Sequence, residues 1–232
     1  MIALLRYQTA TLFRSHRWIF PLIVYVLLMA VGGNDPNPTA GSAAQLARIE
    51  GQALASALDW SAAVLVPVIA LLTRSMLTAE PGAARACVAV ARGPARAQLA
   101  TLLVPFAVGV LLGLAGACYE LVTNGHHTAL LMPFLAGLGK ALVCVLVGSA
   151  VGTLFNPPVI RHAAAALLST VAAVVVALVS SVSPASAALR GNGATVQAAA
   201  WPAGVPLAAA AALAAVGWAL SCWLAGRRAE AS

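Results

Sequence analysis

Six long apolar runs constrain the fold of this chain more than any other feature. They cover residues 18–31, 53–77, 99–118, 129–155, 163–182 and 207–226. An α-helix rises about 1.5 Å per residue, so about 20 apolar residues cross a hydrocarbon core of about 30 Å. The connections between the runs leave no room for a separate soluble domain. The pattern predicts an all-α, polytopic membrane protein whose six transmembrane helices form one domain over residues 1–232.

Composition supports the membrane class and disfavours nucleic-acid binding. Of the 232 residues, 62% are hydrophobic and 8% are charged, whereas a soluble domain has about 25% charged residues. The net charge of +7 comes from arginines scattered in short connections, without a basic face and interleaved aromatic residues. The four cysteines lie singly, with no C-x-x-C spacing, which predicts neither a disulfide framework nor a zinc site. The many arginines and alanines are typical of a GC-rich bacterial genome.

The first 17 residues form a basic, amphipathic segment. Its apolar side chains fall on one side of a helix and its arginines on another: Ile2, Leu5, Leu12 and Phe13, against Arg6, Arg14 and Arg17. This pattern predicts an interfacial helix over residues 1–17. A cleaved signal peptide is the alternative, because a basic start followed by an apolar core is also its signature. We favour a retained first span, since Pro21 breaks the core early and five more apolar runs follow.

The distribution of arginine predicts the orientation in the membrane. Six spans place both termini on one side, and short basic connections stay in the cytoplasm. Ten arginines fall on the side of the termini: Arg6, Arg14, Arg17, Arg74, Arg85, Arg92, Arg96, Arg161, Arg227 and Arg228. Only Arg48 and Arg190 fall on the other side. We therefore expect both termini in the cytoplasm of a bacterial inner membrane, with residues 183–204 as an external connection.

Residues 78–98 form a long polar, arginine-bearing segment between two apolar runs. Pro81 suits the first turn of a helix, and Gly93 followed by proline ends that helix. The spacing of Ala84, Cys87, Val88 and Ala91 predicts one apolar face, with Arg85 and Arg92 pointing elsewhere. A short amphipathic helix beside a membrane is suited to docking a partner. The expected partner-binding residues are Glu80, Arg85, Cys87, Val88 and Arg92.

These features together resemble the membrane-spanning permease subunits of type-2 ATP-binding cassette (ABC) exporters, in their short six-span bacterial form. The resemblance covers the whole chain and is architectural: the basic interfacial helix, six spans with both ends inside, and the segment between Glu80 and Arg96. It implies that this segment is the coupling helix inserted into an ATP-binding subunit, and that residues 183–204 match the family's outer insertion. It also implies two membrane subunits, identical or different, and two ATP-binding subunits that export drugs, antibiotics, peptides, lipids or glycans.

The chain lacks the residues needed to hydrolyse ATP itself. A phosphate-binding loop requires G-x-x-x-x-G-K-[ST], but here Phe134 occupies the first glycine position and Ala141 follows the lysine. We therefore expect no cofactor in this chain, with ATP and Mg²⁺ on the partner subunit, and no enzymatic activity of its own. His126 and His127, near Glu120, are interpreted as a solvated turn in preference to a metal site.

Lys140 is a charged residue well inside an apolar run, where insertion scales assign a cost of about 3 kcal/mol. Three interpretations remain. It faces a cavity and contacts an anionic substrate, it pairs with Glu120 or Asp59, or it lies shallow, with its stem snorkelling outward from a helix that begins near Pro133. The shallow position is preferred, and Asp59 itself is interpreted as a surface charge.

Two further features bear on packing and function. Gly109 and Gly113, like Gly148 and Gly152, have the small-xxx-small spacing that lets helices approach closely, and we favour packing within one subunit over a dimer contact. Apolar spans with few polar groups point to a lipophilic cargo. The alternatives to an exporter are a gradient-driven secondary transporter, which needs titratable groups near the midplane, and an intramembrane enzyme, for which no catalytic set is present.

Overall fold

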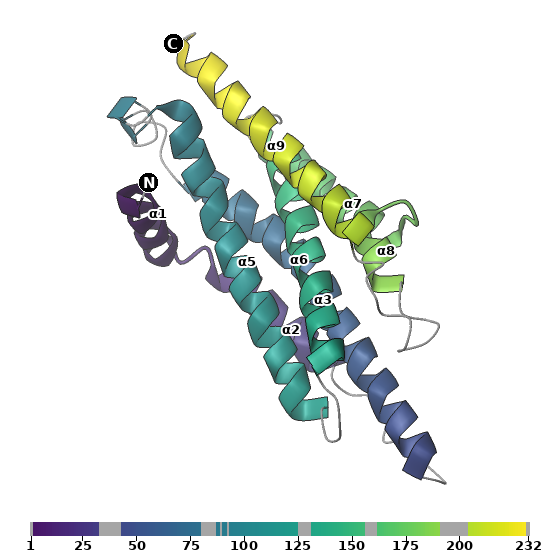
Figure 1. The fold of residues 1–232 in the computed structure, drawn as a ribbon. Coiled ribbons are helices and arrows are strands. Elements are labelled where there is room, and N and C mark those ends of the chain that lie inside the picture. Colours follow the sequence, from purple (N-terminus) through teal and green to yellow (C-terminus); the bar gives the residue numbers. More distant parts are fainter. Residues whose placement is uncertain are drawn as a thin grey trace.

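The computed structural model describes residues 2–32, 43–79, 87–88, 90–91, 93–124, 131–155, 162–190 and 204–230. Its elements are α1 (Ile2–Ser15), α2 (Ile19–Gly32), α3 (Ala43–Ala79), α5 (Pro94–Asn124), α6 (Leu131–Leu154), α7 (Ala163–Val179), α8 (Pro184–Arg190) and α9 (Gly204–Glu230). The long helices lie side by side in an elongated bundle (Figure 1). The predicted all-α class is confirmed for the described part of the chain.

Within the described ranges, five helical stretches are long and apolar enough to cross a membrane. They are Ala53–Ala79, Pro94–Thr123, Pro133–Leu154, Ala164–Arg190 and Gly204–Arg227. The first predicted span differs from these, because α2 has only 14 residues and is therefore about 21 Å long. A sixth span exists among the described residues only if α1 and α2, which are bent by 74° at their junction, count as one broken span. The structure thus supports a multi-pass helical membrane protein with five or six spans.

The junction between α1 and α2 is fixed by local backbone geometry and by one long-range contact. His16 has a φ of 54°, in the left-handed region, which turns the chain sharply between the two helices. The neighbouring Arg17 donates from Nη1 to the carbonyl oxygen of Thr78, at 2.9 Å. Because Thr78 lies in the last turn of α3, this bond holds the start of α2 against the end of α3.

Helix α3 lies at the centre of the apolar core, with α5 and α6 packed against it. Its residues Leu65, Val66, Val68 and Ile69 are essentially inaccessible. All four glycines noted in the sequence pack within this core: Gly109 against Ile69 and Val145, Gly113 against Leu65 and Ala141, Gly148 against Val66, and Gly152 against Ala70 and Thr73. The preferred interpretation, packing within one subunit, agrees with these contacts.

The contacts also give the directions of the helices. Gly137 of α6 packs against Leu58 of α3, and Gly152 packs against Thr73, so the two helices run parallel. Between α5 and α9, Gln98 Nε2 donates to Ser221 Oγ at 2.8 Å, and both side chains are buried. The start of α5 therefore lies beside the last turns of α9.

One end of the bundle gathers most of the described arginines. The Arg17 bond to Thr78 and the Gln98 bond to Ser221 place the α1–α2 junction, the end of α3, the start of α5 and the end of α9 at this end. The start of α1 and the end of α9 lie in the upper half of the view in Figure 1. We call this the arginine-rich end; its described arginines are Arg6, Arg14, Arg17, Arg74, Arg96, Arg227 and Arg228. Along the sequence, connections rich in arginine alternate with connections that have few basic residues, and this alternation brings the arginines to one end.

The opposite end contains an element that the sequence analysis did not predict. The fifth apolar run is interrupted, because α7 ends at Val179 and Ser180 has an extended backbone. The short helix α8 follows, with Ala185, Ser186 and Ala188 buried. The region expected as an external connection therefore begins with a packed helix, while residues 191–203 lie outside the described part.

Candidate functional site

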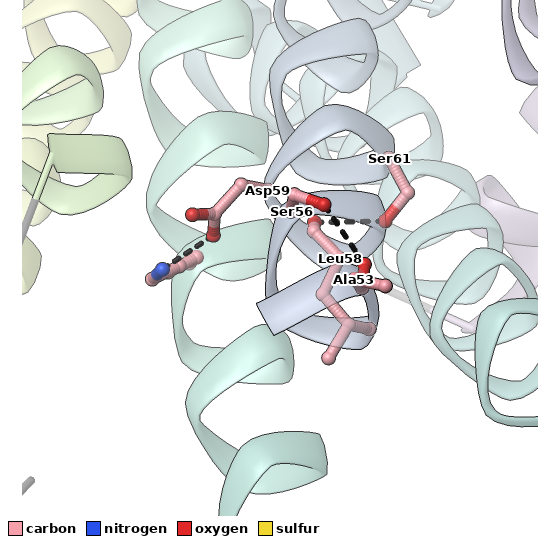
Figure 2. Close-up of polar contacts among 6 residues, drawn as sticks. Ala53, Ser56, Leu58, Asp59 and Ser61 are labelled. Carbon is pink, nitrogen blue, oxygen red and sulfur yellow. Dashed lines mark hydrogen bonds and ion pairs between the residues drawn. The ribbon is translucent and has the colours of Figure 1, made fainter. Parts of the chain in front are cut away.

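A buried ion pair joins α3 and α6. Lys140 Nζ of α6 donates to the Asp59 Oδ1 carboxylate of α3. The Lys140 side chain is 8% exposed and the Asp59 side chain 24%. Figure 2 shows Asp59 and Ser61 on different sides of α3, with the Asp59 carboxylate directed toward α6. The two charges therefore lie in the interface between α3 and α6, the two helices that pack most extensively against each other in the core.

The pair lies inside the membrane-length part of both helices. Asp59 lies in the stretch Ala53–Ala79 and Lys140 in the stretch Pro133–Leu154, both long and apolar enough to cross a membrane. Because α3 and α6 run parallel and Gly137 packs against Leu58, the two side chains lie at the same level of the bundle. A charge so placed is costly unless it is paired, and each partner offsets the cost of the other.

The surroundings of the pair are almost closed. A recess of about 20 Å³ adjoins it, lined by Ala55, Leu58, Asp59, Pro133, Gly137 and Lys140. This volume suits about one water molecule, far below the roughly 300–1,000 Å³ of small-molecule sites. In this conformation the recess is too small for a bound substrate.

The structure corrects two interpretations of these charges. Lys140 is not a shallow residue with an outward-running stem: α6 does begin near Pro133, at Leu131, but the lysine turns inward to Asp59. Asp59 is not a surface charge. Each of the two charges lies inside an apolar run, Asp59 in residues 53–77 and Lys140 in residues 129–155, and this is the sequence signal that points to pairing.

Glu120, the other carboxylate considered for Lys140, is also buried. It lies near the end of α5, and its residue is only 1% exposed. Residues of α2 pack nearby, since a Cβ added at Gly116, one turn earlier on α5, would meet the Tyr25 hydroxyl. That hydroxyl donates to the Leu112 carbonyl at 3.1 Å. The half of the bundle that holds the Asp59–Lys140 pair therefore contains a further buried acidic group.

The predicted partner-binding segment is described only in part. Glu80, Arg85 and Arg92 lie outside the described residues, whereas Cys87 and Val88 are helical. Cys87 is exposed and Val88 is half-buried. Val90, which the spacing does not place on the predicted face, is 89% exposed. The described part of this segment therefore presents apolar side chains to its surroundings at the arginine-rich end.

The structure places no metal site among the residues it describes. No group of three or more histidine, cysteine, aspartate or glutamate side chains in that part of the chain is arranged to hold a metal ion. His126 and His127 lie outside the described residues.

The geometry thus offers two features with chemical consequences: the Asp59–Lys140 pair within the helices, and the helical segment around Val88 at the arginine-rich end. Comparisons with protein-family models, curated proteins and solved structures give no significant match to this chain.

Proposed function

We propose that the chain is the membrane-spanning permease subunit of an ABC exporter, which moves a lipophilic substrate out of the cell by alternating access. The observation that carries this proposal is the exposed helical stretch between α3 and α5, at the arginine-rich end. A membrane subunit can respond to ATP hydrolysis on another chain only through an element outside the membrane. A short helix with exposed apolar side chains is suited to that contact.

The exposure of Val90 is the most specific part of this support. An apolar side chain gains about 25 cal/mol for each Å² removed from water, so a valine that is 89% exposed favours a covering surface. Cys87 and Ala91 of the same stretch are also exposed. In the proposal an ATP-binding subunit, which holds ATP and Mg²⁺, covers them. A second permease chain, identical or different, completes the transporter, and this chain itself holds no cofactor.

The proposal includes an orientation in the bacterial inner membrane. The arginine-rich end would face the cytoplasm, and the bent α1–α2 pair would be the first of six spans. The connection that leads from α8 to the start of α9 would lie outside the cell. In a cysteine-free background we expect Asn192→Cys to react with an impermeant maleimide in intact cells and Arg92→Cys to react only after permeabilisation. Labelling of position 92 in intact cells, or protection of position 192, would contradict this orientation.

Substituting the exposed valine tests the proposed docking directly. Val90→Asp should abolish copurification of a Walker-motif ATPase from the source cells, because docking would bury a carboxylate at a cost of several kcal/mol. Val88→Asp should have the same effect on association. Since Val88 is half-buried, its variant must also be shown to unfold at the same temperature as the wild type.

Val182→Asp is the matched control. Val182 is 90% exposed, close to the value for Val90, but it lies between α7 and α8 at the opposite end. We expect this variant to retain the ATPase. If folded Val90→Asp and Val88→Asp proteins keep the ATPase and full substrate-stimulated hydrolysis, the coupling role of residues 78–98 is lost.

A second candidate function is supported by the buried ion pair. A gradient-driven secondary transporter requires titratable groups within the membrane, and the Asp59–Lys140 pair supplies two of them, with Glu120 buried in the same half of the bundle. Reconstitution of the purified chain alone separates the two functions. Substrate movement driven by an imposed proton or sodium gradient, without ATP or an ATPase, would favour the secondary transporter.

A further inference from the structure

A groove of about 290 Å³ lies at the arginine-rich end, between the α1–α2 junction and the last turns of α3. It is lined by Arg17, Phe20, Pro21, Leu71, Arg74, Ser75 and Thr78. Two of these residues are cationic, two carry hydroxyl groups, and three are apolar. None of the described residues that line it is a carboxylate, and the two arginines give this lining a positive charge.

The position of Arg17 in the groove is fixed by the fold. Its Nη1 donates to the Thr78 carbonyl at 2.9 Å and approaches Thr78 Oγ1 at 3.4 Å. Both bonds use one nitrogen, whereas a guanidinium has five N–H donors in a rigid fork. Arg74 is on α3, one turn before Thr78, and lines the same groove as Arg17. Such a paired arrangement of guanidinium groups fits the oxygens of a phosphate.

The apolar wall of the groove continues along α2. Phe20, Ile23, Leu27 and Val31 are all exposed and follow one another at spacings of three and four residues. This spacing places them in one stripe along a helix. The stripe begins at Phe20, inside the groove, and leads away from the two arginines toward the middle of the bundle. A ligand that fits both parts has an anionic head and a hydrocarbon chain.

We propose that the groove binds the anionic headgroup of a phospholipid, with one acyl chain lying along the exposed stripe of α2. The volume of about 290 Å³ is at the small end of ligand sites and suits a headgroup rather than a whole lipid. Basic pockets between transmembrane helices bind such headgroups through the same combination of charge and hydrogen bonding. The inference is independent of the cargo and of the energy source.

Lipid titration of the purified full-length protein in neutral detergent tests the proposal, with native mass spectrometry as the readout. Phosphatidylglycerol should bind more tightly than zwitterionic phosphatidylcholine. Arg74→Gln and Arg17→Gln should each weaken phosphatidylglycerol binding about tenfold or more, the effect expected for a lost charge-assisted hydrogen bond. Arg96→Gln is the matched control: it removes the same charge from an exposed position at the same end, outside the groove, and should leave binding within about twofold.

A second variant distinguishes a lipid site from a site for free anions. This variant leaves Arg17 in place, because the loss of Arg17 would also remove its bond to Thr78. Phe20→Ala removes part of the apolar wall and should weaken the binding of phosphatidylglycerol severalfold. Inorganic phosphate should compete poorly with the lipid in the wild type and in every variant. Equal effects of Arg74→Gln and Arg96→Gln would show attraction to the whole basic end only and would overturn the proposal. Displacement of the lipid by inorganic phosphate at equal concentration, or an unaltered affinity in Phe20→Ala, would overturn the acyl-chain assignment and identify an anion site.

Discussion

Replacing Lys140 with methionine should destabilise the folded protein by about 3 to 5 kcal/mol, the usual loss when one partner of a buried ion pair is removed. Methionine fills a similar volume, so little packing is lost. The loss comes from Asp59, whose carboxylate would stay among apolar side chains without its ammonium partner. Because the Asp59 side chain is 24% exposed, we expect a value toward the lower end of that range. Chemical unfolding in detergent micelles measures the difference.

The double substitution measures how much the stability effect of each charge depends on the other. Lys140→Met combined with Asp59→Leu removes both charges and should recover most of the stability lost in the single variant, because apolar replacements of buried pairs are often neutral or stabilising. The loss in the single variant should also shrink as the pH falls, since protonation neutralises the remaining carboxylate. If the single and double variants were equally unstable, or if the stability loss of the single variant did not change with pH, the two charges would not stabilise each other.

Replacing Gly148 with alanine should cost about 1 to 3 kcal/mol, the usual range for overpacking a close-packed core. A Cβ at this position would lie 2.7 Å from the Val66 carbonyl oxygen. That neighbour is backbone, so the clash can be relieved only by moving α3 and α6 apart. Since α3 carries the centre of the core, the displacement would also loosen the contacts that it makes with α5.

Gly139→Ala provides the control on the same helix. In the described part of the chain, no atom beyond the backbone of its own helical turn and its two neighbours lies within 4 Å of the Cβ position at Gly139, so the new methyl group meets open space. Alanine is a better helix former than glycine by about 1 kcal/mol, and we expect this variant to be as stable as the wild type or slightly more stable. Equal unfolding midpoints for the two variants would contradict the close approach of α3 and α6.

The sequence predicts the class of the fold and the grouping of its ends because both follow from local composition. Apolar runs of about 20 residues form helices in a membrane whatever their neighbours are. The predicted boundary between the amphipathic segment, residues 1–17, and the apolar run, residues 18–31, agrees with the separation of α1 and α2. The 74° bend between them, at the left-handed backbone of His16, was not predicted. Helix α8 was missed for a similar reason, since the break at Ser180 is a feature of backbone geometry within a small-residue stretch.

The candidate site depends on distances between helices, which composition does not determine. Asp59 and Lys140 are separated by 81 positions, and their pairing requires both a parallel α3–α6 contact and the correct register. Depth within each apolar run was visible in the sequence, but the identity of the neighbouring helix was not. The groove is a similar case, because Arg17 and Arg74 line one surface only after α2 and α3 have packed.

The parallel contact between α3 and α6 also determines which parts of the molecule can move. The two helices are joined at separate levels, by the Asp59–Lys140 pair, by Gly148 on Val66, and by Gly152 on Ala70 and Thr73. Sliding or rotating one helix past the other would separate two opposite charges and open two backbone contacts at once. Helices α3 and α6 therefore move together as one rigid unit. The α7–α8 stretch is held less tightly, because only 22% of its apolar stretch is buried, and rearrangement is easier there.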